Sequence, residues 1–485
     1  MPAARSTGAP RADLRQTAAR PCHVVVGSGP AGLAAALLLS ETAPGGRVVL
    51  LEPKSRIGGL WRSFDYGPHG KFDYGMHNLF ECGDVRLDRL LAGLLPSDEW
   101  VRLEGASRDV AGVFYHGRLQ TNSPSIDLRF WPPAERAALA AEIEAAAAQP
   151  PERAKAAENV RDFALAWWGE TVADRVLPPV MRKLFGHAPA ELDLMALRLT
   201  ALSRIVLFDA DRMLELMPFD RLRERLAFPD QRDLPCQYQA GRKGLYPRRR
   251  GMQHLVDAVR ARLLSRHVEI LTDAVVEQIE SRNGRVAALS VGGPEGLRRI
   301  DGIEAVFWAA GLNSALTALN CQKPPGTPDP AQSLTLVHLL VDRHADAEGL
   351  HYLYCYDEGY RTFRATLYAH FLGQRPGGQP ITVELVNVET EDAIAVALRE
   401  LRAFGILDPA SDIRFATAEP MGAIWPMPTL RNHQAAEHGR TVLHDRRLTN
   451  LHLIGQAARP RLFFQGEVMR HVLETLEPYL QGGTH

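Results

Sequence analysis

Hydrophobic and polar positions form a clear pattern near the start of the chain. Short apolar runs at 23–26 and 48–51 lie on either side of a longer apolar stretch, Leu33–Leu39. A short run bounded by turn residues is typical of a buried strand, whereas the longer stretch after a glycine-rich turn favours a helix. The order strand, turn, helix, strand predicts the opening of a parallel α/β sheet.

The rest of the chain shows two further patterns. From about 132 to 226 it is helical: Glu135–Ala148 is alanine-rich with spaced acids, and apolar residues recur at helical spacing over Asn159–Val176. Strand-like runs dominate afterwards, at Val286–Val291, Ala305–Gly311, Thr335–Val341, Ile381–Val386 and Asn450–Gly455. The fold class predicted is therefore α/β, a Rossmann-like domain interrupted by a mixed α+β domain with a helical cap.

The turn at Gly27–Gly32 has the composition of a dinucleotide-binding site. Gly27 permits a tight turn, Gly29 lets the backbone approach a pyrophosphate, and Gly32 lets helix and strand pack closely. Pro30 is tolerated in the first helical turn, where the N-terminal amides favour a phosphate. Glu52, at the end of the second strand, is placed to bind a ribose hydroxyl and disfavours a 2′-phosphate. The turn alone does not decide between NAD and FAD.

The following segment favours FAD. Gly58 and Gly59 let the backbone run close beneath a large cofactor. The sequence Asp73-x-Gly75-x-His77 comes next, and with Glu52 and the glycine pair it resembles the flavoprotein superfamily of amine oxidases, phytoene desaturases, protoporphyrinogen oxidases and UDP-galactopyranose mutases. The resemblance implies that Gly75 and His77 lie beside the isoalloxazine ring. A structural histidine is the alternative interpretation of His77.

Later segments extend the resemblance. Gly-Met-x-x-Leu at Gly251 resembles the return into the FAD domain, after which Val275 or Val276 would contact the adenine side. The end of the chain resembles the family again, with Gly455 at the ribityl phosphate and the helix after Gln465 directed at the flavin. This sequence departs from the family pattern at Gln456, where an arginine is usual. The implied cofactor-binding residues are Gly27, Gly29, Pro30, Ala31, Gly32, Glu52, Gly58, Gly59, Leu60, Trp61, Gly75, Met76, His77, Val276, Gly311, Gly455, Arg461, Phe464 and Gln465.

The resemblance also implies residues for the reaction. An arginine strand followed by a glutamate strand matches Arg361 or Arg364, then Glu384. His77, Arg361 and Arg364 are therefore the candidate catalytic residues. The run Arg248–Arg250 is either a solvated face or a partner for an anionic substrate.

These assignments divide the chain into discontinuous domains. We expect an FAD-binding domain at 21–80, 241–323 and 440–485, and a substrate-binding domain at 81–240 and 324–439. Residues 1–20, rich in alanine and arginine, are expected to be a disordered leader; a transit peptide is the alternative.

Composition narrows the partners. The 485 residues carry a formal net charge of −1, which argues against a nucleic-acid-binding surface. Five scattered cysteines without CxxC spacing indicate reduced thiols in a cytoplasmic protein, with no metal site. No apolar run has the length of a membrane span, and the oligomeric state stays open.

Three functions remain open. The first is an FAD-dependent oxidoreductase or redox-neutral isomerase acting on a polar, anionic small molecule such as a nucleotide-linked or glycosidic sugar, in a biosynthetic pathway. The second is a desaturase or oxidase of an apolar polyene or porphyrinogen. Trp167, Trp168, Phe185 and Phe208 would line an apolar tunnel for that substrate, although Trp167 and Trp168 also fit a core face. The third is FAD binding without catalysis. A monooxygenase is disfavoured because no second GxGxxG is present.

Overall fold

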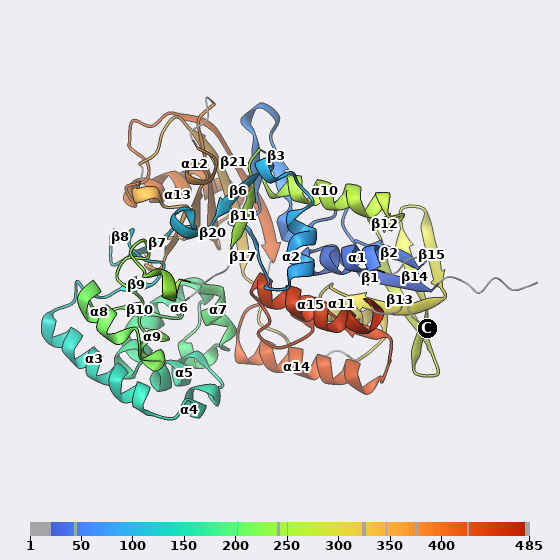
Figure 1. The fold of residues 1–485 in the computed structure, drawn as a ribbon, viewed down its shortest axis with the longest axis horizontal. Coiled ribbons are helices and arrows are strands. Elements are labelled where there is room, and N and C mark those ends of the chain that lie inside the picture. The colour runs from blue at the N-terminus through green and yellow to red at the C-terminus, as the bar shows by residue number, and fades with distance from the viewer. Residues whose placement is uncertain are drawn as a thin grey trace, which may run out of the picture.

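The computed structural model describes residues 21–42, 46–200, 202–239, 243–249, 251–322, 326–345, 347–373, 377–423 and 426–480. The predicted leader, residues 1–20, and Arg250 lie outside this part of the chain. Figure 1 shows a parallel α/β unit on the right, a second large sheet at the upper left and a helical block at the lower left.

The α/β unit is built on a five-stranded parallel sheet with the order β12-β2-β1-β16-β22. Its strands are β1 (Cys22–Val26), β2 (Arg47–Leu51), β12 (Glu269–Leu271), β16 (Ile303–Trp308) and β22 (Leu451–Leu453). The strands come from three separated stretches of chain, so the sheet closes only when distant segments meet. The predicted Rossmann-like α/β fold is confirmed.

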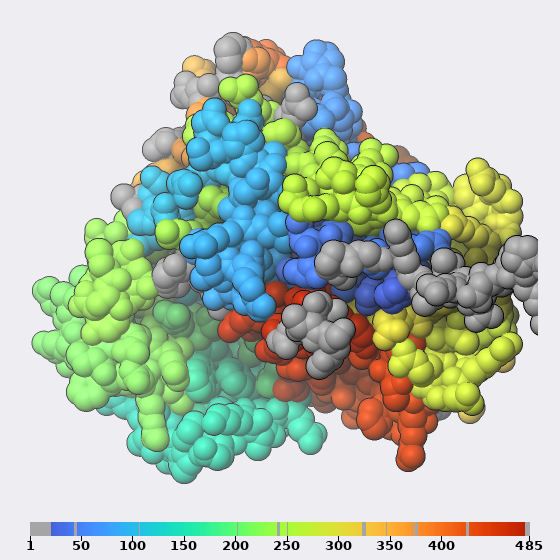
Figure 2. Space-filling model, turned by 45° about the vertical axis from the view of Figure 1, so that its right-hand side comes forward, coloured from blue at the N-terminus to red at the C-terminus, as the bar shows by residue number. Residues whose placement is uncertain are grey.

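Helices cover one face of this sheet. Helix α1 (Pro30–Thr42) packs between α10 (Met252–Ser265) and α15 (Gln465–Leu480). Figure 2 shows the three segments side by side on one face, in blue, yellow-green and red. Alternate residues of β1 face the two sides of the sheet: Val25 packs into this helical layer and Val24 into the opposite one.

The opposite face is covered by a small antiparallel sheet and two helices. The sheet has the order β13-β14-β15, and its core is shared with both helices. These elements are β13 (Val275–Arg282), β14 (Arg285–Gly293), β15 (Gly296–Asp301), α11 (Leu312–Ala318) and α14 (Leu430–Asp445). Helix α14 begins ten residues before the predicted domain boundary at 440, and the division into domains stays a prediction.

The second large sheet has seven strands in the order β21-β17-β20-β19-β18-β7-β8. Its strands are β7 (Ala111–Tyr115), β8 (Arg118–Gln120), β17 (Ser333–Val341), β18 (Tyr352–Cys355), β19 (Thr362–Leu367), β20 (Gln379–Val386) and β21 (Ile413–Ala423). Helix α13 (Thr390–Ala403) packs on one face, over an apolar core that includes Val383 and Ala365. The other face carries polar side chains, because residues alternate along each strand.

The helical block is a separate core packed against this sheet. It contains α3 (Pro133–Ala148), α4 (Glu152–Lys155), α5 (Val160–Trp167), α6 (Leu177–Phe185), α7 (Met195–Thr200), α8 (Ala210–Leu216) and α9 (Asp220–Arg223). The single helix predicted over Asn159–Val176 is wrong. The chain leaves the helix at Gly169, where φ is +105°, and Thr171 then donates its N–H to Glu142 at 2.8 Å.

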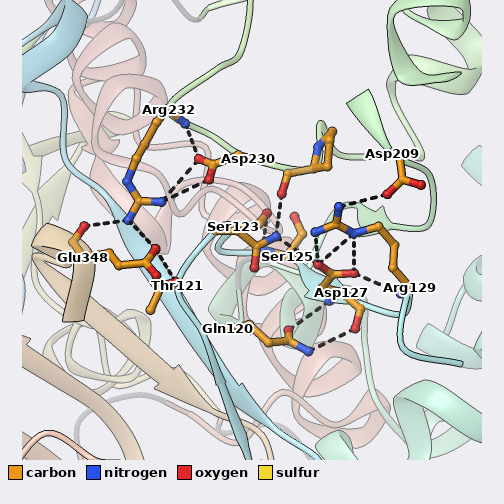
Figure 3. Close-up of polar contacts among 12 residues, drawn as sticks. Gln120, Thr121, Ser123, Ser125, Asp127, Arg129, Asp209, Asp230, Arg232 and Glu348 are labelled. Atoms are coloured by element: carbon orange, nitrogen blue, oxygen red, sulfur yellow. Dashed lines mark hydrogen bonds and ion pairs between the residues drawn. The ribbon is translucent and has the colours of Figure 1, made fainter. Parts of the chain in front are cut away.

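A polar clamp joins the helical block to the seven-stranded sheet (Figure 3). Arg129 binds the buried carboxylate of Asp127 through two nitrogens and also reaches Asp209 of the block. Gln120, at the end of β8, exchanges two 3.0 Å hydrogen bonds with the backbone of Asp127. On the sheet side, Arg232 links Asp230 to the backbone carbonyl of Glu348. The clamp fixes the block on the sheet.

Short strands complete the described part of the chain. A three-stranded sheet, β5-β11-β6, and a hairpin, β3-β4, lie between the α/β unit and the seven-stranded sheet. The remaining elements are β3 (Ser63–Asp65), β4 (Lys71–Asp73), β5 (Leu79–Phe80), α2 (Val85–Ala92), β6 (Trp100–Leu103), β9 (Ile126–Asp127), β10 (Ile205–Val206), β11 (Gly244–Pro247) and α12 (Ala369–Leu372). Among the described residues, no helix combines the length and apolarity needed to cross a membrane.

Candidate functional site

The glycine turn after β1 is shaped by two close approaches. A Cβ on Gly32 would lie 1.8 Å from the carbonyl oxygen of Gly27, and one on Gly27 would lie 2.9 Å from the backbone N of Ala310. Neither position tolerates a side chain. A Cβ on Gly29 would meet nothing within 4 Å, so this glycine faces open space beside the N-terminus of α1. Pro30 is the first residue of that helix and Ala31 is buried in it.

Glu52 locks this turn. Its carboxylate is buried and accepts hydrogen bonds from the Ser28 N–H at 3.0 Å, the Ser28 hydroxyl at 2.5 Å and the Lys54 N–H at 3.0 Å. The Ala274 N–H donates to the Glu52 carbonyl at 2.9 Å and so brings the start of β13, with buried Val276, beside the end of β2. Glu52 therefore holds the turn in shape.

The glycine pair folds over the turn. Gly59 has φ +54°, and its Cβ would lie 2.7 Å from the Cα of Gly29. Gly58 donates its N–H to the Ser28 carbonyl at 3.1 Å. Of the next two residues, Leu60 is exposed and Trp61 is buried in the core.

Two later strand ends meet the same turn. Ala309 and Ala310, after β16, donate their N–H groups to the Val26 carbonyl, and Gly311 caps α11 on the exposed side. Gly455, after β22, has φ +71°, and its Cβ would lie 3.2 Å from that of Ala31. Three stretches of chain therefore surround the start of α1.

The loop Tyr74–His77 meets the polar face of the seven-stranded sheet. Gly75 has φ +114°, and its Cβ would lie 2.9 Å from Oε1 of Glu384 and 3.1 Å from Nη2 of Arg364. Arg364 donates to Glu384 through Nε at 2.6 Å and Nη2 at 3.1 Å. The two side chains are only 15% and 3% exposed. This buried ion pair presses against the glycine predicted to lie at the flavin.

Charge in this cluster is well defined. Burial lowers the pKa of Arg364, but Glu384 and Tyr354 raise it by more, so the guanidinium stays charged. Burial, followed by the charge of Arg364, lowers the pKa of His77 to about 3. His77 is therefore a neutral imidazole at ordinary pH. It can donate one hydrogen bond and accept another but carries no charge of its own.

Asp73 anchors the loop from behind. Its buried carboxylate accepts hydrogen bonds from the Ser63 hydroxyl at 2.5 Å, the Tyr246 hydroxyl at 2.6 Å and the Met252 N–H at 3.0 Å. Burial raises the pKa of Asp73 to about 6, although these hydrogen bonds oppose the rise. The sequence motif contains Asp73 but gave it no role. In the structure it ties the loop to β3, β11 and the N-terminus of α10.

Some candidate residues lie elsewhere. Arg361 is exposed, and its backbone N–H donates to Glu400 of α13, which covers the other face of the sheet. The structure does not bring Arg361 to the cluster around Gly75. In the arginine run, Arg248 donates to the backbone carbonyls of Asp98 and Trp100, and Arg249 pairs with Glu99. Neither arginine meets Arg364.

The segment before α15 contacts the helical block. Arg461 donates to both carboxylate oxygens of Asp193, the shorter distance being 2.7 Å. Phe464 is 42% exposed, and the guanidinium of Arg198 lies 4.6 Å from its ring centroid. Gln465 begins α15 and accepts the Phe80 N–H at 3.3 Å. Of these three predicted residues, Gln465 is the one tied to the loop that follows His77.

The predicted apolar tunnel in the helical block is not formed by the tryptophans. Trp168 is buried, and its indole N–H donates to the Arg225 carbonyl at 3.0 Å. Trp167 lies under the Arg225 guanidinium, 3.8 Å from the ring centroid. Phe185 is buried in the same core. The alternative interpretation, a core face, is confirmed for Trp168.

The residues around α1 fit a dinucleotide cofactor with a flavin. Gly29 leaves open space at a helix N-terminus, where phosphate binding is favoured. Beyond the loop, both amide atoms of buried Asn78 and Nε2 of Gln465 have no hydrogen-bond partner among the described residues. Buried polar groups are normally paired, so these atoms indicate a missing polar partner. No sequence motif pointed to Asn78.

Comparisons with known proteins agree with this fold. A family model described as an NAD(P)-binding Rossmann-like domain matches residues 25–94. No curated protein sequence matches the chain. Among solved structures, a reduced UDP-galactopyranose mutase is 16% identical, with a TM-score of 0.70 and 96% of both chains covered.

Two other similar solved structures are described as oxidases. A protein described as a protoporphyrinogen oxidase from Exiguobacterium sp. 255-15 is 13% identical, with a TM-score of 0.64, covering 95% of this chain and 98% of that one. Cyclohexylamine oxidase from Brevibacterium oxydans IH-35A is 15% identical, with a TM-score of 0.59, covering 95% and 99%. The predicted resemblance to this superfamily is confirmed at the level of the fold.

Proposed function

We propose that the chain is an FAD-dependent enzyme of the oxidoreductase or redox-neutral mutase kind, acting on a polar, anionic metabolite such as a nucleotide-linked or glycosidic sugar. The observation that carries this proposal is the buried Arg364–Glu384 pair against Gly75. An ion pair taken out of water is retained only where its geometry is good, and such pairs gather at functional sites.

Residues around the start of α1 would hold the cofactor. The N–H groups of Gly29 and Ala31 and the positive end of α1 suit the pyrophosphate, and Glu52 suits the ribose. Gly455 opposes Ala31 on the other side. When bound, FAD supplies an acceptor for a hydride or a nucleophilic ring nitrogen.

The chain's own residues would orient the substrate. A guanidinium has five N–H donors, and the Glu384 carboxylate takes two of those of Arg364. Donors remain for Tyr354, which bonds to this arginine, and for a substrate oxygen. On the same face of the sheet, the buried Thr366 hydroxyl has no hydrogen-bond partner within the described chain. This face offers hydrogen bonds to a substrate that carries hydroxyl or phosphate oxygens.

His77 would act as a neutral group. Because the low pKa of its imidazole keeps it uncharged, it can hold a substrate hydroxyl through a hydrogen bond. The similarity to a UDP-galactopyranose mutase structure supports a sugar-linked substrate.

A second candidate is an enzyme for an apolar substrate. Partly buried Phe64, Met421 and Phe463 pack against the helical core from the sheet side. These side chains could line an apolar passage in place of the tryptophans. One similar structure, described as a CLA-producing fatty acid isomerase from P. acnes, has a TM-score of 0.55 at 14% identity, with 94% of this chain and 98% of that one covered.

Anaerobic titration of the purified holoprotein separates the two candidates. A panel of sugar nucleotides and a matched panel of fatty acids and polyenes are added, and the flavin absorption spectrum is recorded. We expect at least one sugar nucleotide to shift the spectrum, and the shift to be lost in Arg364→Met. A response to the apolar panel alone would support the second candidate and reject the first.

A further inference from the structure

Asn78 is a buried carboxamide whose hydrogen-bonding groups are unused. It follows His77 directly and is 3% exposed. Neither Nδ2 nor Oδ1 has a hydrogen-bond partner among the described residues. Leaving both ends of a buried amide unpaired is costly, so such a group normally meets a ligand or an ordered water.

A second unpaired amide belongs to Gln465, which contacts the chain two residues after Asn78. Phe80, two residues after Asn78, donates its N–H to Oε1 of Gln465 at 3.3 Å. Nε2 of Gln465 is buried and has no partner in the described chain. Gln465 is also the first residue of α15, a 16-residue helix whose N-terminal end favours electron-rich groups. Asn78 and Gln465 together therefore offer two unused donors, Nδ2 and Nε2, and one unused acceptor, Oδ1. The Phe80–Gln465 hydrogen bond brings their two segments together at the N-terminal end of α15.

This set of groups is complementary to a cyclic imide. A carboxamide offers a donor and an acceptor side by side, so it can pair with a ring N–H and the adjacent ring carbonyl at once. The pyrimidine part of an isoalloxazine has such an edge, a ring N–H between two carbonyls. We propose that Asn78, with Gln465 Nε2 as a second donor, binds this imide edge of the flavin. The proposal rests on the FAD-dependent function proposed above.

An ordered water is the competing explanation for Asn78. One buried water can satisfy a donor and an acceptor without any ligand. The two explanations differ in what happens when the flavin ring N–H is blocked. A water-bonded Asn78 is indifferent to that change, whereas an imide-bonded Asn78 loses its acceptor contact and meets a methyl group.

The test uses FAD and its N3-methyl analogue. Apoprotein of wild type, Asn78→Leu and a control variant is titrated with each flavin, and dissociation constants are obtained from flavin fluorescence. Leucine has the same branching and the same number of side-chain heavy atoms as asparagine but no hydrogen-bonding group. The control is Gln332→Met, which removes another buried carboxamide that is unpaired within the described chain and precedes β17.

The proposal predicts a specific pattern. Wild type should bind FAD about tenfold more tightly than the N3-methyl analogue, because a buried polar contact is lost. Asn78→Leu should bind FAD about tenfold more weakly than wild type and discriminate between the flavins less than about twofold. Gln332→Met should keep the wild-type preference. Equal binding of the two flavins by wild type, unchanged discrimination in Asn78→Leu, or lost discrimination in the control would each overturn the proposal.

A second variant covers the case in which Asn78→Leu does not fold. Gln465→Glu keeps an acceptor for the Phe80 N–H and places an acid in the first turn of α15, which favours the helix. It replaces the Nε2 donor by an oxygen, so FAD binding should weaken about tenfold. Unchanged binding of FAD by this variant would contradict the role of Nε2. If wild-type apoprotein binds neither flavin, the FAD-dependent function itself fails; if it binds FAD without the predicted pattern, only this inference fails.

Discussion

Replacing Arg364 by methionine should destabilise the protein strongly, and the size of the effect follows from burial. The Glu384 side chain is 3% exposed, and within the described part of the chain its carboxylate accepts two hydrogen bonds, at 2.6 Å and 3.1 Å, both from Arg364. Breaking a buried pair by removing one partner typically costs about 3–5 kcal/mol, because the remaining charge has no compensation. We expect the free energy of unfolding of Arg364→Met at pH 8 to be lower than that of wild type by about 3–5 kcal/mol.

The double variant Arg364→Met/Glu384→Leu provides the matched control. With both charges removed, the site becomes apolar, and replacement of a whole buried pair by apolar residues is often neutral or stabilising. The double variant should therefore recover most of the lost stability but not the turnover.

Denaturant unfolding of the apoprotein, followed by circular dichroism at several pH values, measures these differences. Apoprotein is used because a bound cofactor adds its own stabilisation. A loss of less than about 1 kcal/mol in Arg364→Met would be the size typical of an exposed pair and would refute the buried-pair reasoning. A double variant less stable than the single one would refute it as well.

Three other predictions concern the cofactor side of the site. Gly32→Ala should abolish FAD retention, because its Cβ would lie 1.8 Å from a backbone oxygen, whereas Gly359→Ala, outside the proposed site and with open space around the new Cβ, should retain FAD; co-purified flavin measures both. Glu52→Ala should weaken FAD retention by about tenfold or more, because it unlocks the turn, while His77→Ala should slow turnover with FAD still bound. Loss of FAD in both variants would mean that His77 is structural. Asp73 should make wild type less stable as pH rises from about 4 to 7: its folded pKa of about 6 lies above the unfolded value, so the folded state binds the extra proton and its advantage disappears above the folded pKa. Asp73→Asn should flatten that slope in unfolding curves, and an identical slope in the variant would contradict the assignment.

The dinucleotide half of the site could be predicted from sequence because its signals are local. Gly27–Gly32 and Glu52 lie within one strand–turn–helix–strand unit, where spacing along the chain fixes spacing in space. The structure gives Gly27 and Gly32 a steric reason that agrees with the motif. The role of these residues in holding FAD stays a prediction.

The residues of the seven-stranded sheet were harder to predict from sequence. Which face a side chain occupies depends on the alternation along its strand and on the register with strands that are distant in sequence. The sequence left Arg361 and Arg364 as alternatives, and two residues three apart in a regular strand face opposite sides. The register shifts between Thr362 and Arg364, and Arg364 aligns with Glu384. A single irregularity of this kind cannot be read from an apolar pattern.

Tertiary contacts account for the remaining differences. Arg461 pairs with Asp193, 268 positions away, which no local signal links to the end of the chain. Gly169 breaks a pattern that has helical spacing on both sides, since its positive φ places Thr171 on Glu142. Asn78 could not be predicted from sequence, because its burial and its lack of a hydrogen-bond partner among the described residues are known only from the structure.

The absorption spectrum of the purified protein, with chromatography of the cofactor released on denaturation, tests the central claim most directly. The account predicts a yellow protein that releases FAD. A colourless wild-type protein whose apoprotein does not bind added FAD would contradict it.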